Sequence, residues 1–343
     1  MKPVYIQGLG FLSPAAAGPG ELQKLAGSLL AGDCPSHKDF SEPLEFSLGV
    51  PAGKVRRASR YAKMAVATAQ QSLVDASVPQ EGRQTMGTLF LSGYGSVASY
   101  VRFAEPVAAH TPSLASPMEF SFMVHNSSLG QVCIVFDLQG PSTMFMGGDP
   151  TEYASLLLSE GKAERILCGA IQERDADLCA SFANTGQLDP KNLADGVVML
   201  VLGGAPGAVP YGRITDWTSV AFPVYPYAFP VSGEEQAEIR RKMKETWAGI
   251  SPGDVELVLT TGNGGPWDAW EAEAIHRICG DRVRCLPTKT FLGEALPVSY
   301  LENIALGAAM LRQRAEGDRS APGCIVAAGM DVHGNYLLAK LEE

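Results

Sequence analysis

The residues most suggestive of chemistry lie in one stretch, GPSTMFMGGDPTEYASLLLSEGKAERILCGA, residues 140–170. An apolar run leads into Gly147-Gly148, and the pattern predicts that a helix begins at once and that a strand, ILCGA, follows. Such a turn presents one side chain at a helix N-terminus, where a nucleophile is activated because the helix end lowers its pKa. Here the presented residue is Asp149, a carboxylate in the place of a thiol or hydroxyl.

The run Asp149-Pro150-Thr151-Glu152 also fits a helix start at each position. Asp is a favoured N-cap, Pro is favoured at the first helical position, and Glu three residues on resembles a capping box. We therefore predict that the Asp149 carboxylate accepts backbone N–H groups and that the helix end lowers its pKa. A chemical role for Asp149 is the alternative.

Other candidate motifs predict no cofactor and no metal. GYGSVA after the apolar run LFL matches G-x-G-x-x-A, but this motif alone is weak evidence for dinucleotide binding. The chain has no CxxC pair and no G-x-S-x-G motif. Its five histidines lack metal-ligand spacing; they are His37, His110, His125, His276 and His333.

Composition and charge argue against two classes of protein, those that bind nucleic acid and those that span a membrane. The 343 residues have a formal net charge of −10, which argues against nucleic acid as a partner. No apolar run reaches about 18 residues, and the apolar start is too short for a signal peptide, so we expect no membrane span and a cytoplasmic protein. The segment from Lys54 to Lys63, KVRRASRYAK, has five basic residues and no acid. It is either a solvated helix face or a docking site for an acidic partner.

Strand-like and helix-like runs alternate along the chain, which predicts an α/β fold. GTLFLSGYG resembles VELVLTTGNG, and RILCGAIQE resembles CIVAAGMDV. These pairs predict a duplicated unit, with halves at residues 1–211 and 212–343 that form one compact body. The proline-rich segment FPVYPYAFP, residues 222–230, is predicted to be an extended excursion.

Taken in order, these blocks resemble a β-ketoacyl synthase of the thiolase-like superfamily. VYIQGLGFLSP resembles the opening strand of the family, SPMEFSFMVHNSSLGQVCIVFDLQGPST the segment before its nucleophile, and WEAEAI, KTFLGEA and AAGMDVHGNYLLAKL its later blocks. The resemblance extends over nearly the whole chain. It implies a thiolase-like layered αβαβα fold made of two duplicated halves.

The resemblance also implies which side chains the chemistry needs. In the family a cysteine takes the acyl group and two histidines stabilise the enolate formed by decarboxylation. The cysteine position corresponds to Asp149, the first histidine to Thr260 or Thr261, and the second histidine to Glu294. The lysine of the family remains as Lys289. All three chemical residues are therefore replaced, which predicts a catalytically degenerate member.

A degenerate member of this family resembles the chain-length factors of polyketide and polyene systems. The resemblance implies a heterodimer with an active ketosynthase, formed through the strand beside the nucleophile turn, and an acyl carrier protein as a further partner. Tunnel or interface residues would be Tyr94, Ala98, Tyr100, Met118, Glu119, Phe120 and Phe122. Carrier-protein docking residues would be Arg56, Arg57, Arg60 and Lys63.

Two alternatives remain open at this point. The chain could be a repurposed enzyme in which Asp149, Glu294, Lys289 and Thr261 do different acid–base work in the old pocket. It could also be a homodimeric scaffold for acyl chains or carrier proteins. Ordinary core or dimer packing is the alternative interpretation of the tunnel residues.

Overall fold

The computed structural model describes residues 2–35, 40–109, 111–186, 188–224, 231–251, 253–262 and 265–343. Strands and helices alternate, as the sequence predicts. The strands are β1 (Val4–Leu12), β2 (Gly87–Ser92), β3 (Ser142–Phe145), β4 (Arg165–Gln172), β5 (Gly196–Gly203), β6 (Arg213–Ala221), β7 (Leu257–Thr260), β8 (Arg284–Pro287), β9 (Cys324–Met330) and β10 (Asn335–Glu342). The α-helices are α1 (Pro19–Leu30), α2 (Arg60–Asp75), α3 (Val97–Ala109), α4 (Pro117–Met123), α5 (Ser127–Phe136), α6 (Pro150–Ser159), α7 (Ala176–Thr185), α8 (Gly233–Gly249), α9 (Pro266–Cys279), α10 (Lys289–Leu292) and α11 (Val298–Ala315). Short 3-10 helices span Ala52–Val55, Gln80–Gly82 and Pro112–Leu114.

The described strands form one mixed sheet whose order repeats as a mirror image, β3-β2-β4-β5-β1 followed by β6-β10-β9-β7-β8. The pairing directions repeat as well. β2 is parallel to β3 and β4, as β7 is to β8 and β9, and β5 is antiparallel to β4 and β1, as β10 is to β9 and β6. The fold is therefore a duplicated α/β unit. The exact boundary at residues 211 and 212 stays a prediction.

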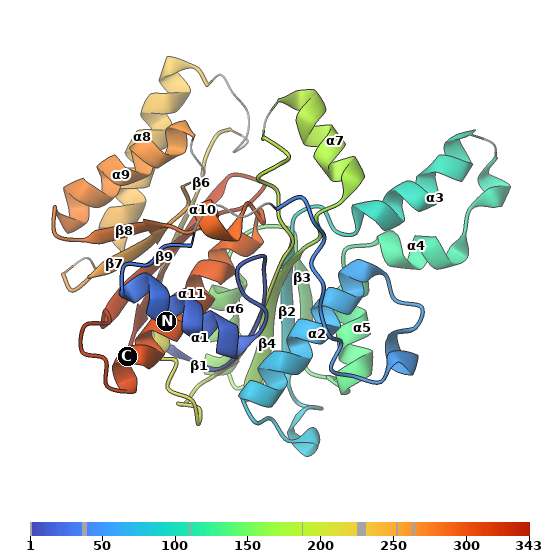
Figure 1. The fold of residues 1–343 in the computed structure, drawn as a ribbon, viewed down its shortest axis with the longest axis horizontal. Coiled ribbons are helices and arrows are strands. Elements are labelled where there is room, and N and C mark those ends of the chain that lie inside the picture. The colour runs from blue at the N-terminus through green and yellow to red at the C-terminus, as the bar shows by residue number, and fades with distance from the viewer. Residues whose placement is uncertain are drawn as a thin grey trace.

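Helices cover both halves of the sheet and also fill the space between them. α2 packs on β1, β4 and β5, and α8 packs on β6 and α9, while α11 contacts strands of both halves. Figure 1 shows this order, from α8 and α9 at upper left, through α11, α1 and α6, to α2 and α5 at lower right. The layers are those of the predicted αβαβα fold.

The apolar pattern of β5 shows why the sheet is buried on both faces. Val197, Met199 and Val201 belong to the core under α2 and α5, whereas Val198, Leu200 and Leu202 belong to the core around α11. Alternate side chains of a strand point to opposite faces, so the unbroken run VVMLVLGG covers two cores at once. In the same way, α11 is buried on all sides over its first 14 residues because it is the central helix.

One part of the fold stands away from these layers. Helices α3 and α4 form an arm that projects from the body in Figure 1. An ion pair between Arg102 and Glu119 at 3.2 Å and a ring contact between Phe103 and Phe120 at 5.6 Å hold the two helices together. We call this element the α3–α4 arm.

Four further points concern the proline-rich segment, the cysteines, membrane-spanning helices and metal sites. Residues 225–230 of the proline-rich segment lie outside the described residues. All seven cysteines are free thiols. No described helix combines the length and apolarity that a membrane crossing requires. Within the described ranges, no group of three or more His, Cys, Asp or Glu residues could hold a metal ion.

Candidate functional site

Asp149 caps α6, as the sequence predicts, and both of its carboxylate oxygens have partners. Oδ1 accepts the backbone N–H groups of Thr151 and Glu152 at 2.8 and 3.3 Å and the Thr151 hydroxyl at 2.7 Å. Oδ2 accepts the hydroxyl of Tyr300, on the central helix α11, at 2.5 Å. The Trp217 indole N–H in turn donates to the Thr151 hydroxyl at 2.9 Å. Asp149 is thus the centre of a network that joins α6 to α11 and β6.

The predicted direction of the Asp149 pKa is wrong. Burial raises the pKa of this carboxyl, although the hydrogen bonds from Tyr300 and Thr151 act in the opposite direction. The residue keeps part of its surface exposed, but its carboxyl group is enclosed by protein. Desolvation disfavours the charged form, and here it outweighs the helix end and the hydrogen bonds.

A second carboxylate, Asp331, holds the turn that leads into α6 in place by hydrogen bonds. Its Oδ2 accepts the backbone N–H of Gly148 at 2.8 Å and the Asn335 amide at 2.7 Å. Its Oδ1 accepts the backbone N–H groups of His333 and Asn335 at 2.8 and 3.0 Å. A Cβ on Gly147 would stand 2.7 Å from Asp331 Oδ2, so glycine is required for this close approach. The backbone N–H of Gly148, directly before Asp149, is therefore already bonded to a carboxylate.

One histidine, His333, lies at this turn, and a second, His125, is close enough to feel its charge. The ring of His333 lies within about 3.0 Å of the Cβ that Gly147 lacks, and the ring of His125 packs against Gly95. Burial, and in second place the charge of His333, lower the pKa of His125. The sequence places the two histidines far apart and gives no sign that they approach each other.

Lys289 and Glu294 form a buried ion pair. The Lys289 ammonium donates to Glu294 Oε2 at 2.7 Å, and Glu294 Oε1 accepts the backbone N–H of Leu296 at 2.9 Å. Both side chains are almost fully buried. The segment after α10 is also held by backbone hydrogen bonds, because Glu294 bonds to Asn192 and Ala194. Glu294, which the sequence resemblance assigns to the second histidine position, is therefore part of a buried ion pair.

Thr261 belongs to a different network, whereas the Thr260 hydroxyl donates to the backbone carbonyl of Leu286 at 3.5 Å. Thr261 donates its backbone N–H and its hydroxyl to Glu271 Oε2 at 3.0 and 2.9 Å. The Tyr336 hydroxyl donates to Glu271 Oε1 at 2.7 Å and accepts the Trp247 indole N–H at 2.9 Å. Burial raises the pKa of Glu271 to about 7. Among the described residues, these threonines have no direct hydrogen bond to Asp149 or Glu294.

The structure thus places four of the five predicted positions in three separate side-chain networks, and Thr260 in none of them. Asp149 pairs with Tyr300, Lys289 pairs with Glu294, and Thr261 pairs with Glu271. The sequence analysis missed Tyr300 and Glu271 as partners. No local signal marks Tyr300, since it meets Asp149 across 151 positions of the chain.

The predicted tunnel residues fall into two groups. Tyr94 is partly buried and packs edge-on against Phe182, with 6.0 Å between ring centroids. On the α3–α4 arm, by contrast, Tyr100 and Phe120 are 57% and 53% exposed, and Met118 is 50% exposed. Ala98 and Phe122 are partly buried, and Glu119 pairs with Arg102. The arm therefore presents large apolar side chains to solvent.

The four predicted carrier-protein docking residues also fall into two groups, according to whether their charge is neutralised. Arg60 donates to both carboxylate oxygens of Asp195, at 2.9 and 2.6 Å, and its second carboxylate neighbour is Glu173 at 3.5 Å. Arg56 and Arg57 are exposed and have no ion pair in the described part of the chain, and Lys63 is partly exposed. The charge of Arg60 is thus neutralised inside the protein.

The outer edge of the sheet at β3 is open and apolar. β3 pairs with β2 on one side only. Four exposed apolar side chains lie on this strand's end and on α5 and α6; they are Ile134, Met146, Tyr153 and Leu156. We call them the apolar edge surface. An open strand edge with exposed apolar neighbours is typical of an interface with another chain.

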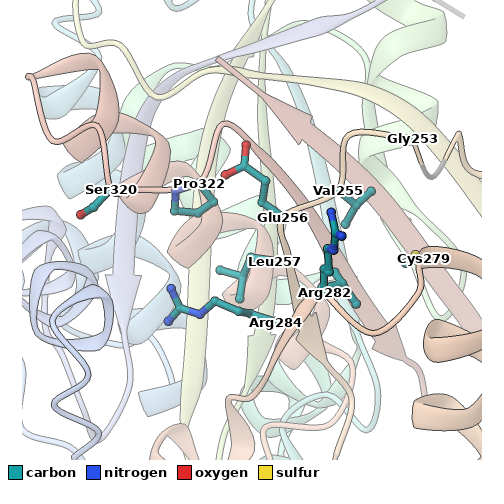
Figure 2. Close-up of a pocket in the computed structure, with 10 residues that line it drawn as sticks. Gly253, Val255, Glu256, Leu257, Cys279, Arg282, Arg284, Ser320 and Pro322 are labelled. Carbon is teal, nitrogen blue, oxygen red and sulfur yellow. The ribbon is translucent and has the colours of Figure 1, made fainter.

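A cavity of about 450 Å³ lies elsewhere, at the amino ends of β7, β8 and β9. Figure 2 shows Arg282, Arg284 and Glu256 around it, with Leu257 between the two arginines. None of the site residues predicted from the sequence lines this cavity. Thr260 lies at the opposite, carboxyl end of β7.

Comparison with known proteins agrees with this architecture. Residues 36–170 match the family model described as the beta-ketoacyl synthase, N-terminal domain. No curated protein sequence matches the chain.

Among solved structures, this chain superimposes on a chain of the AntDE:AntF complex, which is described as a type II PKS acyl-carrier protein in complex with its ketosynthase bound to the hexaketide. The TM-score is 0.80 at 13% identity, over 100% of this chain and 99% of that one. The ishigamide ketosynthase/chain length factor gives 0.74 at 19% identity over 99% of both chains. A beta-ketoacyl synthase from Burkholderia phymatum STM815 gives 0.76 at 16% identity over 100% of both. The whole chain therefore has the thiolase-like fold of the ketosynthases, and its N-terminal part matches their N-terminal domain.

Proposed function

We propose that this chain is a catalytically degenerate ketosynthase homologue that acts as the chain-length-factor-like partner of an active ketosynthase in fatty acid, polyketide or polyene assembly. The observation that carries the proposal is the network around Asp149. Every oxygen of this carboxylate accepts at least one hydrogen bond, from Tyr300, Thr151 or Glu152. A carboxylate held in this way fixes the helix and is a poor nucleophile, because attack would break the network.

The other positions needed for condensation are equally unsuited to it. Decarboxylation needs donors that stabilise a developing enolate, and removing one such donor typically costs about 3–4 kcal/mol of transition-state stabilisation. Glu294 is an acceptor already paired with Lys289, and Thr261 donates its hydroxyl to Glu271. We therefore expect no condensation by this chain alone.

The apolar edge surface supports a role in which this chain acts by binding another protein. An active ketosynthase that added its own edge strand beside β3 would pair the free backbone groups of that strand and cover Ile134, Met146, Tyr153 and Leu156. One similar solved structure is named as a ketosynthase/chain length factor. Tyr100, Met118 and Phe120 on the α3–α4 arm would then form part of the tunnel wall.

A carrier protein is the second partner in this proposal. Arg56 and Arg57, with Lys63 beside them, offer unneutralised positive charge on a chain with a net charge of −10. Acyl carrier proteins are acidic, so this local contrast would steer them to that surface. Arg60 is left out of the docking surface because Asp195 neutralises it. The proposal places the complex in the cytoplasm.

The test is co-expression with a ketosynthase that has the cysteine and both histidines and is encoded beside this chain. We expect a heterodimer in gel filtration and native mass spectrometry. Ile134→Asp should weaken it strongly, because Ile134 is 79% exposed on the apolar edge surface. Val74→Asp is the matched control, since Val74 is 61% exposed on α2, outside that surface. A chain that elutes only with itself would contradict the partner role and favour the homodimeric scaffold.

The repurposed enzyme is the less favoured function. It requires Asp149, Glu294, Lys289 and Thr261 to meet in one pocket with free acid and base groups. In the structure these residues belong to separate networks, and each is engaged by another side chain. Turnover of an acyl thioester by the purified chain alone would support this alternative.

A further inference from the structure

The cavity of about 450 Å³ at the amino ends of β7, β8 and β9 has a positively charged lining that the proposed partner role does not use. Arg282 and Arg284 line it, and Glu256 is the single acid among its described lining residues. Its volume lies in the range typical of pockets for small molecules. Because the whole chain has a net charge of −10, this cavity is a local exception that favours an anion.

The two arginines have no acidic partner. Neither Arg282 nor Arg284 forms an ion pair within the part of the chain that the structure describes, and both side chains are exposed. Asp281, the acid next to Arg282 in the chain, lies 2.9 Å from His276 Nδ1 instead. A guanidinium group has five N–H donors in a planar fork that matches phosphate and carboxylate oxygens. Two such groups at one cavity therefore provide donors for an anion.

Strand pairing positions the two arginines around one buried leucine. Arg284 is the first residue of the edge strand β8, its backbone N–H donates to the Glu256 carbonyl at 3.1 Å, and Leu257 is its partner in register. Figure 2 shows Leu257 between Arg282 and Arg284. A ligand that lies against Leu257 can therefore be approached by a guanidinium group from two sides, and neither group has to break an ion pair.

Much of the remaining lining is apolar. Val255 and Val283 are partly buried and pack against the core under α8 and α9, and Leu257 and Pro322 are buried. A small inorganic anion would leave this surface in contact with water, whereas an apolar group attached to the anion would cover it. The cavity thus combines anion donors with an apolar wall.

A second cavity shows that charge, more than volume, distinguishes the first. This cavity has about 410 Å³ and is lined by Glu164 and Arg165, at the start of β4, and by Gln7 on β1. Arg165 Nε donates to Gln7 Oε1 at 3.0 Å, so this arginine is already engaged. Glu164 supplies the opposite charge beside it. The second cavity therefore offers an anion no surplus of positive charge.

We infer that Arg282 and Arg284 bind a phosphate-bearing small molecule whose apolar part lies against Val255 and Val283. Two guanidinium groups favour the double charge of a phosphate monoester over the single charge of a carboxylate. Glu256 offsets one of the two positive charges and so limits the affinity for the anion. Such a ligand would join the segment before β8 to the segments before β7 and β9.

The site shares no residue with the proposed partner role, so it is tested on the purified chain and either proposal can fail alone. Calorimetric titration uses phenyl phosphate, inorganic phosphate and phenol at about pH 8, where a phosphate monoester is a dianion. We expect phenyl phosphate to bind at least about fivefold more tightly than inorganic phosphate, because its ring covers apolar surface. Phenol should not bind measurably. Added KCl should weaken the binding of phenyl phosphate, since exposed charges are screened.

Four variants assign the binding to this cavity. Arg282→Met and Arg284→Met should each raise the dissociation constant of phenyl phosphate at least about tenfold, because each removes charged hydrogen-bond donors. Glu256→Gln removes the opposing charge and should lower the dissociation constant severalfold. Arg277→Met is the matched control, since Arg277 is an exposed arginine of α9 that does not line the cavity. It should bind like the native chain.

A thiol in the cavity reports where the ligand lies. Cys279 lines the cavity, whereas Cys34 is exposed elsewhere. Phenyl phosphate should slow the alkylation of Cys279 by iodoacetamide severalfold and leave that of Cys34 unchanged. Equal, weak binding of both phosphates in the native chain and in every variant would mean an adventitious ion only and would overturn the inference. Absence of binding, or phenol binding as tightly as phenyl phosphate, would overturn it as well.

Discussion

The hydroxyl of Tyr300 donates to Asp149 Oδ2 at 2.5 Å and so connects the central helix of the C-terminal half to the turn of the N-terminal half. This contact acts as a clamp between the two halves. Asp149 accepts it in addition to the bonds that cap α6, so both of its carboxylate oxygens are engaged by the fold.

Tyr300→Phe should destabilise the protein. The substitution removes one hydrogen bond to an enclosed acid, and bonds to charged groups contribute about 1.5–3 kcal/mol. Urea unfolding should therefore show a lower midpoint without a change in slope. Tyr153→Phe is the control, because Tyr153 is exposed on the apolar edge surface, and it should cost less than about 0.5 kcal/mol. Equal effects of the two variants would argue against a clamp.

Lys289 and Glu294 should behave as one unit. Breaking a buried pair by removing one partner typically costs about 3–5 kcal/mol, since the other charge is left unpaired. Lys289→Met and Glu294→Gln should each show a loss of this size in denaturant unfolding. The double variant should lose clearly less than the sum of the single losses. Additive losses would mean that the two side chains do not depend on each other.

Stability should fall as the pH rises through the titration of Glu271. Its pKa in the folded protein is about 7, whereas an unfolded glutamate titrates near about 4.3. Between these two pKa values the folded state therefore holds a proton that the unfolded state has lost. The stabilisation from Glu271 is fully present below about pH 4.3 and is lost as the pH rises through about 7. Each pKa unit corresponds to about 1.4 kcal/mol.

The variant Glu271→Gln tests this dependence. It keeps an oxygen for Thr261 but cannot ionise, so the slope of unfolding free energy against pH should flatten between about pH 4.3 and 7. Chemical unfolding at several pH values measures the slope. Glu160→Gln, at the exposed end of α6, should leave it unchanged. An unaltered slope in Glu271→Gln would show that Glu271 does not hold the proton.

Asp149→Cys should not restore condensation. The variant has a sulfur at the helix N-terminus, but the positions that the proposed relationship assigns to the two histidines still hold Thr260 or Thr261 and Glu294. The purified variant, assayed with acyl and malonyl carrier protein, should give no carbon–carbon bond formation above the native chain. The active partner ketosynthase provides the positive control. A condensation product from the variant alone would refute the degenerate assignment.

Shrinking the tunnel wall should lengthen the product of the complex. Phe120→Ala removes a ring from the α3–α4 arm, and Tyr94→Ala removes one that packs on Phe182. Mass spectrometry of the product made by the co-expressed pair should show longer chains for at least one variant. Leu114→Ala is the control, since this arm residue is 56% exposed and lies outside the predicted wall. Unchanged product length in both variants would reject the assignment.

Local sequence patterns were sufficient to predict the elements and the cap. The start of α6 at Pro150, the strand β4 and the duplication of the α/β unit follow from short sequence patterns, whereas the mirrored strand order is seen only in the structure. The pKa of Asp149 could not be predicted in this way. Its direction depends on enclosure by groups such as Tyr300, which are distant in the chain.

The ion pair of Arg60 could not be predicted for the same reason, because its partner is distant in the chain. Its neighbours Arg56 and Arg57 make the segment look uniformly basic. The partner of Arg60, Asp195, is 135 positions away and meets it only because β5 begins beside α2. A charge count along the chain cannot detect such a partner, whereas the exposed Arg56 and Arg57 keep the character that the sequence indicates.

The mirrored sheet ends in two unlike strands, and this difference makes one edge better suited than the other to pair with another chain. β3 at one end is flanked by the apolar edge surface. β8 at the other end exposes Arg284 and Cys285 and finishes with Pro287, which has no N–H to extend a ladder. A pair of chains joined along β3 would leave β8 as its outward edge, where charged side chains and a terminal proline disfavour the pairing of a further strand.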